Sequence, residues 1–144
     1  METTNHVVHY RFTRNPVLVG KEGELNLQRI LAGEGVQTEL GYLVNWKTGE
    51  VTKRSHGPRV NWVQVDLYDL ARRWVYDSKI GPRSLTRDLY ERAGLQGQLI
   101  ARGHVNGITW VSLPDHSGDF GFDKDLAVRI WRDFGIETTI RRLQ

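Results

Sequence analysis

The fold is decided by residues 66–113, which read DLYDLARRWVYDSKIGPRSLTRDLYERAGLQGQLIARGHVNGITWVSL. The stretch begins at Asp66, whose carboxylate suits a helix N-cap because it can accept from the unpaired amides of the first turn. Apolar residues then recur at the spacing of one helical stripe, namely at Leu67, Leu70, Ala71, Trp74 and Val75. The pattern predicts a helix that ends in residues 77–82, where glycine and proline interrupt helical hydrogen bonding.

A second helix is predicted over residues 84–93. Ser84 is placed to cap its N-terminus, and Gly94 stands where a left-handed residue commonly ends a helix. One side of this helix is apolar, so its other side is expected to face solvent. The expected exposed residues are Thr86, Arg87, Tyr90 and Glu91.

A hairpin is predicted over residues 99–113. Asn106-Gly107 lies between two apolar-rich runs and suits a type I′ turn, whose central residues need positive φ. Two-residue alternation places Trp110 on the core face of this hairpin, and Arg102 and His104 on the other face near its tip.

Helix, helix and hairpin in this order resemble the winged helix-turn-helix family, over about a third of the chain. The resemblance implies that the second helix enters the major groove of duplex DNA while the hairpin wing touches the flanking backbone. The DNA contacts it implies here are Arg83, Thr86, Arg87 and Tyr90 from the recognition helix, and Arg102 and His104 from the wing. The chain departs from the family at residues 36–64, where a longer segment replaces a single strand. The alternative is that two helices and a hairpin simply pack together, as in many small α+β domains.

Composition sets broad limits. The chain has 144 residues, which predicts a single domain over 1–144 with a core of its own. It has no cysteine, so disulfides and thiolate metal sites are excluded. No run approaches the roughly 20 apolar residues that span a bilayer, so we expect a cytoplasmic protein without membrane contact. The net charge of +3 favours polyanionic partners.

The flanking segments predict an α+β fold, with a winged-helix-like unit, an N-terminal β-hairpin and terminal strands. The expected strands are residues 6–12, 60–65 and 136–143, the expected hairpin is 36–54, and the expected further helices are 22–31 and 123–134. The outgoing strand of the hairpin carries Lys53 and Arg54. These cations are candidate phosphate contacts, although charged edge strands also protect against aggregation.

Residues 114–125, PDHSGDFGFDKD, form a polar loop with a weak resemblance to the ββα-metal fold of HNH endonucleases. That resemblance implies His116 as general base, with Asp115 and either Asp119 or Asp123 as ligands of a divalent metal. The chain departs from the family where the following helix should supply an asparagine and a histidine. A calcium loop is a second possibility, and a simple helix cap by Asp123 is the third.

Three functions follow from the sequence. The first is a small nucleic-acid-binding module, expected to bind duplex DNA without a cofactor and more in keeping with a binding protein than with an enzyme. The second is the metal-dependent endonuclease at the loop 114–125. The third is a regulator or inhibitor, of the kind carried by mobile elements, that acts by contact with another protein.

Overall fold

The computed structural model describes residues 16–53 and 60–142, and these form an α+β fold. In this described part, three helices accompany a six-stranded mixed sheet and a separate two-stranded sheet. The helices are α1 (Pro16–Gly33), α2 (Arg87–Ala101) and α3 (Lys124–Phe134). The strands are β1 (Glu39–Asn45), β2 (Val51–Lys53), β3 (Trp62–Asp69), β4 (Trp74–Ile80), β5 (Pro82–Arg83), β6 (Gly107–Leu113), β7 (Gly121–Phe122) and β8 (Glu137–Ile140).

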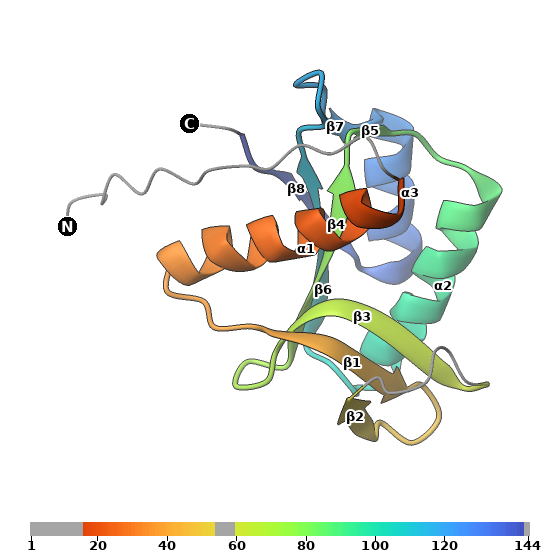
Figure 1. Cartoon of the computed structure of the whole chain (residues 1–144). Coiled ribbons are helices and arrows are strands. Elements are labelled where there is room, and N and C mark those ends of the chain that lie inside the picture. The colour runs from red at the N-terminus through yellow and green to blue at the C-terminus, as the bar shows by residue number, and fades with distance from the viewer. Residues whose placement is uncertain (1–15, 54–59, 143–144) are drawn as a thin grey trace.

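The large sheet changes character along its strand order of β2-β1-β3-β4-β6-β8. The neighbours from β2 to β4 pair antiparallel, whereas β6 pairs parallel with both β4 and β8. Parallel neighbours need a crossover, and α2 and α3 provide the two that are required here. Figure 1 shows α1 crossing one face of the sheet, with α2 and α3 on the other.

Two apolar clusters hold these layers together. On the α1 side, Leu27 and Leu31 pack with residues of β3 and β6 such as Leu113. On the α2 and α3 side, Trp110 packs within a larger cluster of buried residues. Strand β6 is buried at every position, as expected for a parallel strand covered on both faces.

The helix predicted from Asp66 is wrong: the segment forms the antiparallel strands β3 and β4. Residues 70–73 make the turn between them, where Arg73 has a φ of 56° and Asp69 Oδ1 accepts from Arg72 N at 3.1 Å. The short apolar run fits a period of two as well as one of 3.6, and burial alternates along β4. Pairing with β1 and β6 therefore overrides the helical pattern.

The hairpin predicted over residues 99–113 is also wrong, because α2 extends to Ala101 and only β6 follows. Asn106 is no hairpin turn residue. Its side-chain amide donates to Arg72 O at 2.9 Å and its backbone N donates to Arg73 O at 2.7 Å, so it braces the β3–β4 turn. Gly107 then starts β6 beneath the ring of Trp74, and residues 66–113 contain neither a helix pair nor a wing.

The second predicted helix exists but is shifted and longer, since Thr86 is the N-cap and Gly94 does not end it. Gly94 and Gly97 instead face Phe134 of α3. A Cβ on Gly97 would lie 2.9 Å from the Cβ of Phe134, so the two helices approach at this glycine. Sequence alone does not distinguish a glycine that ends a helix from one that a neighbouring helix requires.

Other predictions are confirmed. Strands β1 and β2 form the expected hairpin, β3 covers most of the strand predicted at 60–65, and β8 is the expected terminal strand. Asp123 caps α3, and Gly135 ends it with a φ of 73°. The predicted helix at 22–31 lies within the longer α1. The strand predicted at 6–12 lies outside the described residues, among which no helix is long and apolar enough to cross a membrane.

Candidate active site

The candidate site lies where β3 and β4 separate. Their ladder ends at the pair Leu67 and Tyr76, and the next two opposed residues are Asp66 and Asp77. Here Ser78 N donates to Asp66 Oδ2 at 3.0 Å, and the carboxyl groups of Asp66 and Asp77 are hydrogen-bonded to each other. Two acidic side chains from neighbouring strands therefore meet at one point.

Lys79 adds a buried positive charge to this pair. It lies two residues after Asp77, on the same face of β4, and its Nζ is 3.3 Å from Asp77 Oδ1. The same ammonium lies 4.5 Å from the ring centroid of Trp110. Asp77 and Lys79 are each only 4 % exposed, and charges so deeply buried are seldom found without partners.

A buried amide supports Asp77 from α2. Gln96 Nε2 donates to Asp77 Oδ2 at 2.7 Å, and Trp110 Nε1 donates to Gln96 Oε1 at 2.6 Å. Both carboxylate oxygens of Asp77 are thus engaged, one by Lys79 and one by Gln96. The side chain is held in a single orientation.

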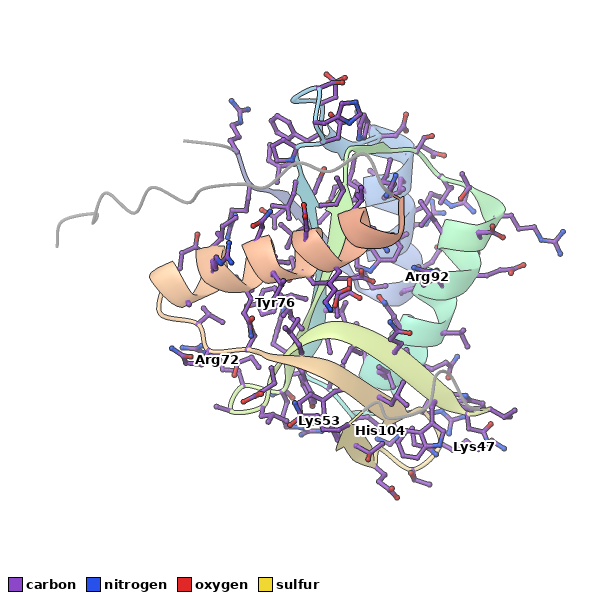
Figure 2. All side chains as sticks on the ribbon, in the orientation of Figure 1. Lys47, Lys53, Arg72, Tyr76, Arg92 and His104 are labelled. Atoms are coloured by element: carbon purple, nitrogen blue, oxygen red, sulfur yellow. The ribbon has the colours of Figure 1, made fainter. Side chains whose placement is uncertain are left out.

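Asp66, Asp77 and Lys79 line a cavity of about 630 Å³. From the α1 side it is lined by Glu24, and from the α2 side by Arg83, Thr86 and Arg92, of which Arg92 is labelled on α2 in Figure 2. Helix α1 can lie close to β4 because Gly23 has no side chain: a Cβ there would collide with Ile80 Cδ1. The cavity therefore has an acidic centre and a rim that carries the two arginines and Asp88.

The pKa values of the two aspartates are shifted in opposite directions. Burial, the charge and hydrogen bond of Asp77, and the charge of Glu24 raise the pKa of Asp66 to about 9, against a lowering contribution from the Ser78 amide. Burial also acts to raise the pKa of Asp77, but Lys79 and the hydrogen bonds from Asp66, Gln96 and Lys79 outweigh it and lower that pKa. Near neutral pH the pair therefore holds one proton, on Asp66, and one negative charge, on Asp77.

The donors suit a hard divalent cation. Mg²⁺ is commonly bound through one or two carboxylates, with water and substrate phosphates completing its shell, and Mn²⁺ accepts the same ligands. Asp77 supplies one such carboxylate, Asp66 supplies a second once it loses its proton, and the charge of Glu24 acts on Asp66. Among residues 16–53 and 60–142, no three His, Cys, Asp or Glu side chains are grouped to hold a metal without help. The residues thus fit a cation that a phosphate also binds, and do not fit a closed protein cage.

The structure brings some predicted nucleic-acid contacts to this cavity. Arg83 and Thr86 line it, although Thr86 also accepts from Leu89 N as the helix cap. Arg87 is exposed and pairs with Glu91 at 3.0 Å. Tyr90, expected to face solvent, is half-buried: it packs against Phe134 of α3, and its hydroxyl donates to Asp133 at 2.7 Å.

Other predicted contacts gather at a different edge, by β1, β2 and the end of α2 (Figure 2). Arg102 lies 4.9 Å from the Trp46 ring centroid, and a ring nitrogen of His104 is 3.1 Å from Trp46 O. Lys53 is exposed beside Tyr42 and Glu39. None of these three side chains lines the cavity, and Arg54 lies outside the described residues.

The loop 114–125 does not assemble the predicted metal site. Asp115 Oδ1 accepts from the backbone amides of Ser117 and Asp119 at 2.9 and 3.0 Å, which is a local turn. His116 and Asp119 are exposed, and Asp123 accepts from Asp125 N as the cap of α3. Within the described part of the chain, these residues form no metal-binding group.

None of the residues at the centre of this site was predicted as a site residue from the sequence, namely Asp66, Asp77, Lys79, Glu24 and Gln96. A signal was available in Asp77-Ser78-Lys79, where two charges at alternate positions interrupt the apolar run of a strand. The prediction of a helix assigned Asp66 as its cap and residues 77–82 as its end. The alternate charges were therefore not recognised as belonging to a buried strand. Comparison of the chain with protein-family models, curated sequences and solved structures gives no match.

Proposed function

We propose that this protein is a divalent-metal-dependent phosphodiester hydrolase that acts on nucleic acid. The observation that supports it best is the meeting of Asp66, Asp77 and Lys79 at one cavity with arginines on its rim. Strongly perturbed carboxyl groups in a cavity are typical of functional sites, because a fold gains no stability from a carboxylate that must stay protonated. The adjoining cations favour an anionic substrate.

In this proposal the aspartates, the lysine and the arginines of the site each have a separate role. Asp66 and Asp77 would hold Mg²⁺ or Mn²⁺, which supplies polarisation of a phosphoryl oxygen and a more acidic bound water. Lys79 is held by Asp77 and lines the cavity, so its remaining N–H groups can orient the attacking water and offset charge that develops on the phosphate. Arg83 and Arg92 would bind neighbouring phosphates of the strand.

Other dicarboxylate chemistry agrees less well with this geometry. A retaining glycosidase keeps its two carboxyl groups about 5 Å apart to receive a sugar ring, and an inverting enzyme keeps them farther apart. Asp66 and Asp77 are in hydrogen-bond contact. The buried ion pair of Asp77 with Lys79 also has no part in that chemistry.

The hypothesis of a nucleic-acid-binding module becomes part of this proposal. Arg83, Thr86 and Arg87, predicted as DNA contacts, lie at the N-terminal end of α2 beside or near the cavity. They would hold the duplex or strand whose phosphate reaches Asp77. Among the described residues, His116 belongs to no group that could hold a metal, so catalysis at His116 gains no support. The regulator hypothesis makes the opposite prediction of no hydrolysis.

The test is hydrolysis of end-labelled single-stranded and duplex DNA and RNA with Mg²⁺, with Mn²⁺ and with a chelator. We expect metal-dependent cleavage that Asp77→Asn and Lys79→Met each reduce by at least about 100-fold. His116→Ala and Asp119→Asn change exposed polar residues elsewhere and should retain full activity. No cleavage of any of these substrates, or full activity in Asp77→Asn, overturns the proposal, whereas loss of activity in His116→Ala alone moves the site to the loop 114–125.

A further inference from the structure

Four buried side chains close a ring of contacts around the candidate site. Asp77 contacts Lys79 and Gln96, and Trp110 contacts the same two residues. Trp110 is 0 % exposed and Gln96 is 1 % exposed. The parallel register of β4 and β6 makes Asp77 and Trp110 direct neighbours in the sheet, so the arrangement is set by strand pairing.

We propose that Trp110 is a positioning residue that orients Asp77 through Gln96 and holds Lys79 on its ring, so that one side chain fixes both charged groups of the site. This proposal rests on the proposed function, because it assigns a role within the same site. It assigns Trp110 no contact with substrate or metal.

The indole N–H selects the orientation of the Gln96 amide. Trp110 Nε1 can only donate, so the group of Gln96 that faces it at 2.6 Å must be the oxygen. The amide nitrogen of Gln96 is then the group that faces Asp77 Oδ2, where it donates at 2.7 Å. A flipped amide would place two N–H donors against the indole N–H and an oxygen against a carboxylate, which is unfavourable at both ends.

The ring of Trp110 performs the second task. A lysine side chain has a flexible four-carbon stem, and an ammonium at a catalytic site gains from a fixed position. The face of Trp110 lies 4.5 Å from Lys79 Nζ, which is a favourable cation–π distance. Strand β6 is covered on both sides, so this support is rigid.

The two tasks can be separated by substitution. Trp110→Phe keeps an aromatic face for Lys79 but removes the N–H donor, so Gln96 loses its fixed orientation. We expect Mn²⁺ affinity, measured by calorimetry, to fall about 10- to 100-fold, as is typical when a partner of a metal ligand is removed. Trp110→Leu removes both contacts and should also lower kcat below that of Trp110→Phe.

A double-mutant cycle tests the route through Gln96. Gln96→Leu alone should lower Mn²⁺ affinity about as much as Trp110→Phe, and the combined variant should be no worse than Gln96→Leu. The matched control is Trp74→Phe, which removes an indole N–H bond of 2.8 Å to Thr109 between the same two strands but outside the cavity. Circular dichroism and thermal melting of each variant identify any that fail to fold.

The outcomes separate this inference from the function on which it rests. If the unmodified protein neither cleaves nucleic acid nor binds Mn²⁺, the proposed function and the role of Trp110 are both overturned. If it does so but folded Trp110→Phe matches Trp74→Phe in Mn²⁺ affinity, only the positioning role is overturned. Additive losses from Gln96→Leu and Trp110→Phe would likewise contradict a route through Gln96.

Discussion

Asp66 and Asp77 face each other one position beyond the last β3–β4 pair, and their carboxyl groups share a hydrogen bond. Paired strands would normally fill this position with a cross-strand contact between apolar residues. Two like charges here would repel, so the pair retains a proton while Lys79 neutralises the remaining charge. Keeping Asp66 buried and protonated therefore lowers the free energy of unfolding at neutral pH.

Asp66→Asn should stabilise the protein at neutral and mildly alkaline pH. The pKa of Asp66 is about 9 in the folded chain against the ordinary aspartate value of 3.8, so between these values the folded state binds a proton that the unfolded state has lost. The free energy of unfolding therefore falls as pH rises through this window, by up to about 1.4 kcal/mol per pH unit for one proton. Asparagine removes this dependence.

Urea unfolding at pH 6 and at pH 8 measures this effect. We expect the variant to exceed the unmodified protein in stability, with an advantage that grows by at least about 1 kcal/mol between the two conditions. Asp119→Asn is the control, because that residue is exposed and should show no such trend. An advantage that shrinks with rising pH would show that Asp66 is not the protonated group.

Divalent metal should compete with the proton on Asp66. Binding to this carboxyl group requires its ionised form, so affinity for Mn²⁺ should increase with pH up to about 9, the pKa of Asp66. Calorimetry at pH 7 in two buffers of different ionisation enthalpy should report the release of about one proton per ion bound. Binding without proton release would place the ion elsewhere.

Lys79→Met should destabilise the fold, and a second change should rescue it. Methionine replaces the buried stem of Lys79 but leaves the carboxylate of Asp77 without its main counter-charge. Removing one member of a buried pair commonly costs about 3 to 5 kcal/mol. Asp77→Asn combined with Lys79→Met removes both charges and should recover most of that loss in urea unfolding, whereas an additive loss would mean that the two side chains do not interact.

Gly23→Ala should lower stability and misplace Glu24. The added Cβ would collide with Ile80 Cδ1 and lie 2.8 Å from Ile80 Cγ1, so the Ile80 side chain or α1 must shift. We expect a loss of about 1 to 3 kcal/mol in thermal or urea unfolding. Gly20→Ala is the matched control in the same helix, since nothing lies within 4 Å of its Cβ and alanine favours a helix by up to about 1 kcal/mol.

Local signals in the sequence were sufficient for several elements. Asp123 and Gly135 bound α3 because capping and left-handed C-terminal geometry involve only nearby backbone. The β1–β2 hairpin follows from a turn between two runs of β-forming residues. Trp110 was expected in the core on apolar alternation and is fully buried there, although its strand is not part of a hairpin.

The site itself depends on contacts between distant segments. Nothing local relates Asp66 to Glu24, which lines the same cavity from α1, or to Gln96 and Trp110, which support Asp77 from behind. The apolar residues from Leu67 to Val75 fit both a helix and a strand. They form strands because β3 pairs with β1 and β4 pairs with β6. Sequence alone thus determined the α+β class, the caps of α3 and much of the core. Tertiary structure decided which charges are buried together, because burial and strand register are properties of the assembled sheet.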